Sequence, residues 1–240
     1  PRPDFIVFAD THHETQGTYD FAERWAPWLG EHGLQVVTVE GTRTQVILEG
    51  RSRQAVMIPA FTLGARGNRG QIRRQCTYAW KIAPIRHFIR NELKARGEKK
   101  RAGAAECWQG ISLDEWRRMR TSDVQYISNE YPLVDLRMTR QDCLEWLKSH
   151  DLPAPPKSAC TFCPFHNLAA WKALKRLRGV DWQEAVKVDE AIRHKRSHAG
   201  YELYVHPGLK PLAKAIALPE DGGGFQSEMD IECECGYCFT

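Results

Sequence analysis

Two apolar runs with a helical pattern between them open the sequence. Residues 5–9 form a continuous β-branched and aromatic run that stops at Asp10, which predicts a strand buried on both faces, as in a parallel sheet. Residues 18–29 carry apolar positions at helical spacing, and residues 34–39 form a second β-branched run. The order strand, helix, strand predicts a βαβ unit.

The next segment combines a basic loop with a long helical pattern. Residues 64–70 are rich in Gly and Arg and predict a loop, and apolar residues recur at helical spacing from about 71 to 95. Pro84 lies inside this pattern and should kink or divide the helix. Residues 107–111 are apolar enough to predict another strand.

The second half of the chain reads as mostly helical. Residues 112–115 resemble a capping box, and residues 139–150 predict an amphipathic helix that begins at Thr139. Two more helices are expected at 168–177 and 182–195. The alternation predicts an α/β fold with a doubly wound, mainly parallel sheet and a C-terminal helical extension.

The organisation expected along the chain has three parts. An α/β domain should span 1–165, a helical extension 166–220 and a flexible, cysteine-rich tail 221–240. Because Pro1 leads directly into a strand without an initiator Met, we expect further residues upstream of it.

Composition narrows the class of protein. Eight cysteines in 240 residues, without a long apolar run or a secretory segment, indicate a cytoplasmic, non-membrane protein whose thiols bind metal or react rather than form disulfides. The net charge is +4, and the cations gather in residues 66–74, 94–101 and 117–120. Such groups fit a phosphate-bearing partner, and they equally fit solvated helix faces.

The pair Cys160 and Cys163, followed by Pro164, is the strongest chemical signal. Two thiolates two residues apart can hold one metal centre, because the loop between them curls around it. A structural zinc site that also uses the tail cysteines, and a redox dithiol, are the alternatives. Cys76 lies at the expected start of the long helix, where helix amides and nearby arginines favour a thiolate ligand. His166 is a further ligand candidate if Cys76 does not take part.

These residues resemble the phosphoadenosine phosphosulfate (PAPS) reductase family within the ATP pyrophosphatase superfamily. Asp10 and Thr11 after the first strand, followed by Glu14 and Thr15, are similar to its Asp-Thr-Gly…Glu-Thr segment. Further similarities follow in the family's order at Cys76, Lys81 and Pro84, at residues 110–118, at residues 131–147 and at residues 158–163.

The resemblance implies a fold, a site and cofactors. It implies an adenine nucleotide alpha-hydrolase-like sheet whose first strand and phosphate-binding loop lie upstream of Pro1. It also implies a 4Fe-4S cluster on Cys76, Cys160 and Cys163, with zinc as the alternative, and ATP bound with Mg. The residues that would border the nucleotide or hold phosphate are Asp10, Thr11, Arg73, Arg74, Lys81 and Arg118.

Departures from the family pattern shift the expected chemistry. Cluster-containing reductases of the family carry paired cysteines on the helix, where this chain has Gln75 before Cys76. With three cysteines, one iron of the cluster would have no protein thiolate. Such a cluster resembles that of the relatives that thiolate tRNA, and the relatives that insert sulfur into DNA are another sulfur-inserting branch of the same superfamily. The tail residues Cys235 and Cys238 partly resemble the reductases' Glu-Cys-Gly-Leu-His end, and both are candidate nucleophiles. A plain tail or a small zinc clasp would explain them equally well.

Three functions are therefore compared. The leading one is an ATP-dependent sulfurtransferase acting on DNA, tRNA or a nucleotide, with sulfur from a donor protein such as a cysteine desulfurase. The second is a sulfonucleotide reductase, in which Cys235 attacks sulfur and thioredoxin releases sulfite. The third is a non-catalytic, zinc-binding module for nucleic-acid binding or assembly. Iron with labile sulfide would separate the first two from the third.

Overall fold

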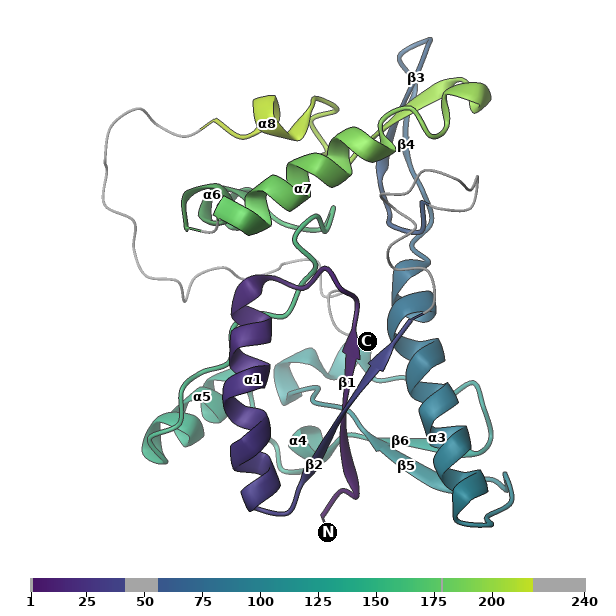
Figure 1. The fold of residues 1–240 in the computed structure, drawn as a ribbon, viewed down its shortest axis with the longest axis vertical. Coiled ribbons are helices and arrows are strands. Elements are labelled where there is room, and N and C mark those ends of the chain that lie inside the picture. The colour runs from purple at the N-terminus through teal and green to yellow at the C-terminus, as the bar shows by residue number, and fades with distance from the viewer. Residues whose placement is uncertain (1, 42–55, 178, 218–240) are drawn as a thin grey trace. The chain divides into compact units, whose positions relative to one another are not determined.

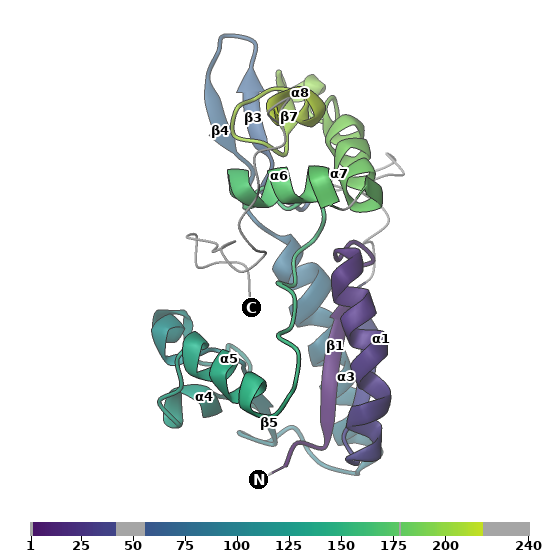
Figure 2. The same ribbon diagram turned by 90° about the vertical axis from the view of Figure 1, so that its left-hand side faces the viewer.

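A computed structural model describes residues 2–41, 56–177 and 179–217. The chain divides into two compact units (Figures 1 and 2). The first unit combines the residues up to Pro84 with those from Lys157 onward, and the second unit is the inserted segment Ile85–Pro156.

The first unit begins with the predicted βαβ unit. Strand β1 (Phe5–Asp10) pairs in parallel with β2 (Gln35–Glu40), and helix α1 (Gln16–Glu31) connects them and lies alongside (Figure 1). The expectation that the first strand is buried on both faces is wrong, since all six residues of β1 are only partly buried. Among the described strands β1 has a single neighbour, β2, so one of its edges carries no strand.

The rest of the first unit forms a sheet covered by helices (Figure 2). Strand β3 (Phe61–Gly64) pairs antiparallel with both β4 (Arg69–Gln71) and β7 (Tyr201–Tyr204), so part of the expected loop at 64–70 is the turn of a hairpin. The helices are α6 (Leu168–Leu177), α7 (Gly179–Ile192) and α8 (Leu212–Ala215), with a 3-10 turn η3 (Ser197–Ala199). The two predicted helices at 168–177 and 182–195 are thus confirmed, the second beginning and ending three residues earlier.

The hydrophobic core of the first unit lies between these helices and the sheet. Its largest members are Trp80, Phe162 and Trp171, none more than 1% exposed. Cys76 and Cys160 pack against this core and are themselves only partly buried. Burying three aromatic side chains dominates the stabilisation of this region, since each removes roughly 150–250 Å² from water.

The long helical pattern at 71–95 forms two different helices. Residues 77–82 form a π-helix, η1 (Thr77–Ile82), and α3 (Ala83–Ala95) continues from it. Pro84 has no N–H to close an α-helical bond to the Trp80 carbonyl, and the Ala83 N–H instead reaches back to the Tyr78 carbonyl. Pro84 therefore divides the pattern as expected, whereas the helix begins six residues later because Gln71 belongs to β4.

The second unit contains most of α3, a short parallel sheet and three further helical segments. Strands β5 (Ala105–Trp108) and β6 (Ile127–Glu130) pair in parallel, so the strand expected at 107–111 begins and ends earlier. The helical segments after α3 are the 3-10 turn η2 (Leu113–Arg118), α4 (Pro132–Asp135) and α5 (Arg140–Ser149).

The two helix starts predicted in this unit differ in outcome. Thr139 stands at the start of α5, where the sequence predicts a helix to begin, and it forms a complete capping box with Asp142. The capping box expected at Ser112 is wrong, because the Ser112 side chain makes no capping hydrogen bond and the Glu115 carboxylate binds Arg118 instead.

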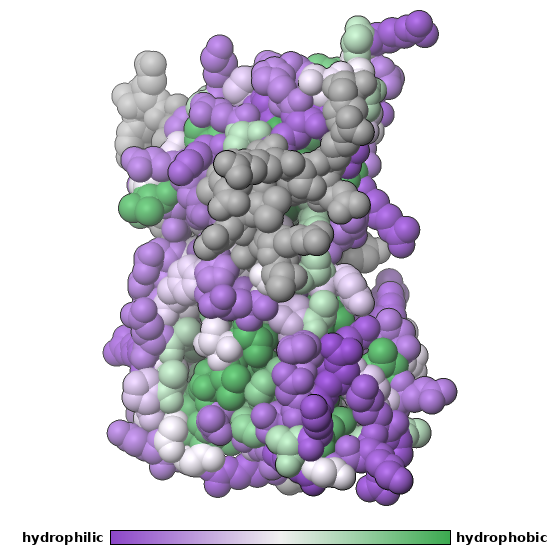
Figure 3. Space-filling view, turned by 45° about the vertical axis from the view of Figure 1, so that its right-hand side comes forward, coloured by the Kyte–Doolittle hydropathy of each residue, from purple (hydrophilic) through white to green (hydrophobic). Residues whose placement is uncertain are grey.

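The architecture is mixed α/β with short parallel and antiparallel sheets. Figure 3 shows hydrophobic residues gathered in the lower part of one face, within a surface that is otherwise mainly hydrophilic. None of the described helices has the length and apolar character needed to cross a membrane.

Candidate thiol site

The segment that follows β1 pairs with the segment that contains Cys160, the first of the two close-spaced cysteines. Glu14 and Cys160 form an antiparallel bridge, the Thr15 N–H donates to the Ala159 carbonyl at 3.2 Å, and the Thr161 N–H donates to the His13 carbonyl at 2.8 Å. These bonds hold Cys160 directly beyond the carboxyl end of β1. In α/β proteins this end of a parallel strand is where ligands bind.

The Cys160 sulfur contacts a buried side chain, although the residue itself is only partly buried. Its Sγ is 3.5 Å from Thr11 Oγ1, and Thr11 is fully buried. Burial, and then the negative charge of Glu14, raise the pKa of the Cys160 thiol to about 12, while Lys81 and the Thr11 hydroxyl act in the opposite direction. Cys76 also raises this pKa, so the two sulfurs are close enough to interact electrostatically.

Cys163 lies one turn further along. Its N–H donates to the Cys160 carbonyl at 3.0 Å, which closes the turn, and the Cys163 carbonyl accepts from the His166 N–H at the same distance. The His166 ring binds the Cys160 carbonyl through Nε2 at 2.9 Å and packs edge-on against Trp171. Burial lowers the pKa of His166 to about 4, so the ring is neutral at physiological pH. It braces the turn.

Cys76 stands directly before η1. Its N–H and that of Gln75 both donate to the Met57 carbonyl, at 3.1 and 2.9 Å, which fixes the start of the π-helix. π-Helical turns are rare and frequently occur at functional sites. Gly41, the residue after β2, packs directly against the backbone of η1. A Cβ at this position would lie 2.7 Å from the Trp80 Cα, so the close approach of these two segments depends on glycine.

Lys81 extends from η1 toward the thiols. Its Nζ lies 3.0 Å from the Glu14 Oε1, and the Glu14 side chain is fully buried. Burial alone would lower the pKa of Lys81, but Glu14, Cys160 and Cys163 outweigh it, and the pKa lies above its ordinary value. Ser158 and Thr11 also donate to the Glu14 carboxylate, at 2.9 and 3.4 Å. A positive charge is thus fixed beside two sulfurs.

A second carboxylate, which is partly buried, supports the same turn. Glu184 on α7 accepts from Thr161 Oγ1 at 2.8 Å and lies 2.7 Å from the His13 Nδ1, and the His13 ring packs on Phe162. Glu184 has no sequence signal, since a single acid on an amphipathic helix is ordinarily solvated. Glu14 had only its place in the Glu-Thr segment to single it out.

The ends of β1 and β2 carry a polar group beside the thiol site. Asp10 Oδ1 accepts from the His12 N–H at 2.7 Å and from the Tyr19 hydroxyl at 2.8 Å. The His12 ring lies between two carboxylates, with Nδ1 3.5 Å from Asp10 and Nε2 3.3 Å from Glu40. Since opposite ring nitrogens face the two acids, the arrangement is that of a bridging histidine, although the three residues lie close enough to share a cation.

The remaining predicted site residues that the structure describes make other contacts. Arg73 is exposed, and the Arg74 guanidinium lies over the Phe165 ring at 5.5 Å. Arg118 belongs to the second unit, where it donates to Glu115 at 2.6 Å. Cys235 and Cys238 are outside the described residues.

The spacing of the thiols bears on which metal group they fit. In a tetrahedral zinc site with Zn–S bonds of about 2.3 Å, ligand sulfurs lie roughly 4 Å apart. Among the described residues, the three sulfurs of Cys76, Cys160 and Cys163 do not all lie within 4.8 Å of one another. In the part of the chain that the structure describes, these three thiols are therefore not preassembled as a site for a single ion.

Comparison of the sequence and structure with protein-family models, curated proteins and solved structures found no match.

Proposed function

We propose that this chain is a PAPS reductase-family enzyme that transfers sulfur to a nucleic acid or nucleotide in an ATP-dependent reaction, with a 4Fe-4S cluster on Cys76, Cys160 and Cys163. The doubly wound sheet of that family and binding of ATP with Mg belong to the same proposal. Bound at these thiols, such a cluster would supply an iron that can hold sulfur.

One observation carries the proposal. The pairing of Glu14 with Cys160 sets the close-spaced thiols beyond the end of β1, and Cys76 at the start of η1 lies within electrostatic range of Cys160. Cys76 and Cys160 are separated by more than eighty residues, and no local spacing rule would bring them together.

The surrounding residues suit a negatively charged, water-poor centre. Three cysteine thiolates in a buried site carry a large desolvation cost, and the Lys81 ammonium offsets part of it by direct attraction. Glu14 fixes the position of that ammonium, and the Thr11 hydroxyl lies within hydrogen-bond distance of both the Glu14 carboxylate and the Cys160 sulfur. The Cys160 thiol must lose its proton before it can bind metal, which its high pKa opposes in the metal-free chain.

The nucleotide side of the proposal rests on the strand ends. An oxygen of the substrate would attack the α-phosphorus of ATP and release pyrophosphate, and sulfur would then displace that oxygen with AMP as the leaving group. Asp10 and Thr11 stand where a nucleotide would bind in an α/β sheet, beside the thiols. Arg73 and Arg74 precede Cys76 in the chain and would hold phosphate charge.

The metal content tests the site. After anaerobic purification, the wild-type chain should contain about four iron and four acid-labile sulfide atoms per molecule. Cys160→Ala should lose most of both. Cys107→Ala is the matched control, because Cys107 is a half-buried thiol on β5 of the second unit and should keep the wild-type content.

Zinc without sulfide in the wild-type chain would overturn the cluster assignment. The reaction is tested separately, by ATP-dependent incorporation of radiolabelled sulfur from cysteine into DNA or tRNA in the presence of a cysteine desulfurase. Incorporation that is independent of ATP, or unchanged in Cys160→Ala, would contradict the proposed function.

A further inference from the structure

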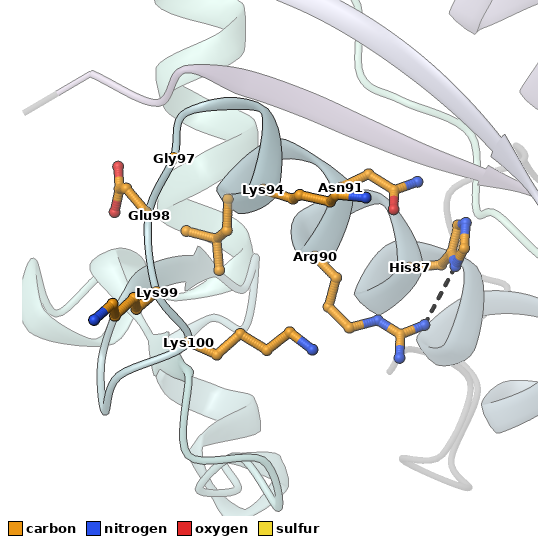
Figure 4. A pocket seen from close by; sticks show the side chains of 9 residues that line it. His87, Arg90, Asn91, Lys94, Gly97, Glu98, Lys99 and Lys100 are labelled. Carbon is orange, nitrogen blue, oxygen red and sulfur yellow. Dashed lines mark hydrogen bonds between the residues drawn. The ribbon is translucent and has the colours of Figure 1, made fainter.

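A basic hollow lies on the second unit, at the end of α3. It has a volume of about 690 Å³ and is lined by four cationic side chains, Arg90, Lys94, Lys99 and Lys100, with Glu98 as the acidic residue in its lining (Figure 4). Figure 4 shows that Arg90 on the helix and Lys100 on the following loop extend into the space between these two segments.

The chain turn at the end of α3 creates this hollow. The Glu98 N–H donates to the Leu93 carbonyl at 2.8 Å and the Gly97 N–H to the Lys94 carbonyl at 3.1 Å, with Gly97 at φ +70°. This pair of bonds is a Schellman motif, which requires a residue that tolerates positive φ. The motif folds residues 98–100 back beside the last turns of the helix, so cations from the helix and the loop face one space.

The lysines in the hollow are not paired with any acid in the described part of the chain. Among the described residues, Lys94, Lys99 and Lys100 form no ion pair. Arg90 contacts the His87 ring at 3.2 Å rather than a carboxylate. Four cations gathered with only one acid in the same lining repel one another, and a polyanion that binds among them removes this repulsion and releases its own counterions.

We infer that this hollow, which we call the α3-end surface, binds the phosphate backbone of a nucleic-acid duplex. Arg90 and Lys94 are four residues apart on one helix face, which places them about 6 Å apart along the axis and spans roughly two phosphates of one strand. Asn91 in the lining adds an amide donor of the kind that also contacts phosphates.

The composition of the lining indicates backbone contacts rather than base recognition. The lining holds no Phe, Tyr or Trp, which single-stranded binders use to stack bases. The surface is therefore expected to bind duplexes without sequence preference and with a strong dependence on salt. This inference deepens the proposed function by naming a duplex nucleic acid as the bound substrate class, but its residues lie apart in sequence from the cysteines.

The test measures binding of the 240-residue chain to a fluorescein-labelled 20-base-pair DNA duplex, and to an RNA duplex of the same sequence, by anisotropy at 50, 100 and 200 mM NaCl. The triple variant Lys94→Gln, Lys99→Gln, Lys100→Gln should bind at least tenfold more weakly at 100 mM. The slope of log K against log salt should fall in magnitude by about 2 to 3. The duplex that binds more tightly identifies the kind of nucleic acid.

A matched control variant removes the same number of positive charges from other parts of the surface. Lys148→Gln, Lys187→Gln, Lys214→Gln removes three exposed lysines from α5, α7 and α8, and should weaken binding less than threefold. Equal weakening by both triples, or no wild-type binding at 50 mM, would overturn the inference. Cys160→Ala should bind as the wild type does, so loss of the thiol site and loss of this surface give different results.

Discussion

The Glu14 carboxylate, fully buried, meets the Lys81 ammonium at 3.0 Å, and this ion pair links the segment after β1 to the π-helix that follows Cys76. Each partner alone would be an uncompensated charge in a poorly hydrated place. The pair is therefore a condition for bringing the thiol-bearing segments together.

Removing one partner of this pair should destabilise the first unit more than removing both. Lys81→Met leaves the Glu14 charge buried and should cost about 3 kcal/mol in the free energy of unfolding, whereas the double variant Glu14→Gln, Lys81→Met should recover part of that loss. Urea unfolding of the four chains gives the coupling energy. Additive single effects would show that the two charges do not depend on each other.

Gly41 should be intolerant of even a methyl group. In Gly41→Ala the new Cβ would meet the backbone of Trp80 at 2.7 Å, so η1 would have to shift and carry Cys76 and Lys81 with it. We expect a lower thermal midpoint and a reduced iron content after anaerobic purification. Gly30→Ala is the control, because its Cβ meets nothing within 4 Å and it lies inside α1, where Ala stabilises by about 0.5–1 kcal/mol. Equal effects of the two variants would contradict this account.

Asp189 holds three elements of the first unit together. Its carboxylate accepts from the Val205 N–H at 3.0 Å and the Leu212 N–H at 2.9 Å, and pairs with Arg193. Asp189→Ala would leave two buried N–H groups and a buried guanidinium without this partner, at a cost of about 3–5 kcal/mol. Asp189→Asn keeps an acceptor and should cost less. Urea midpoints measure both, and an alanine variant within about 1 kcal/mol of wild type would refute the assignment.

Asp114 should contribute stability that disappears in acid. Burial acts to raise the pKa of Asp114, but the Arg140 N–H at 2.9 Å and the Ser112 hydroxyl outweigh it, and the pKa lies below its ordinary value. A carboxyl whose pKa is lowered on folding stabilises the protein above its unfolded-state pKa of about 3.9, and this contribution is lost as pH falls through the folded-state pKa.

The measurement compares wild type with Asp114→Asn by urea unfolding from pH 6 to pH 3. The difference should be small at pH 6, under about 1 kcal/mol because the side chain is exposed, and should vanish toward pH 3. A difference that is independent of pH would mean that charge plays no part.

Sequence patterns predicted the elements whose signals are local. The βαβ unit, the helix that begins after Thr139 and the helix at 168–177 follow from periodicity and from side chains within four residues of one another. The π-helix after Cys76 was not predictable, because it depends on a missing N–H at Pro84 and on bonds to Met57 in a distant segment. The capping box at Ser112 failed for a similar reason, since Glu115 found a stronger partner in Arg118.

In the candidate site, too, the features with a local sequence signal were predictable and the long-range contacts were not. The thiols stand out in the sequence as a close-spaced pair and a helix-start cysteine, and their resemblance to a family pattern predicted that they would meet. Glu184 and its bonds to His13 and Thr161 have no sequence signal. The bond to His13 joins α7 to a loop that lies about 170 residues earlier in the chain. Long-range polar contacts of this kind follow from packing, which a single sequence does not reveal.

Because the second unit is inserted within the sequence of the first, the first unit is completed late during synthesis. The first unit needs residues from both sides of Ile85–Pro156, so a nascent chain cannot complete the thiol site when Cys76 leaves the ribosome. At roughly 5–20 residues per second, Cys163 follows several seconds later. During that interval the second unit, which is continuous in sequence, can already fold, while Cys76 stays without its partners and open to oxidation. The emergence of Cys160 and Cys163 would thus decide when the thiol site can be completed.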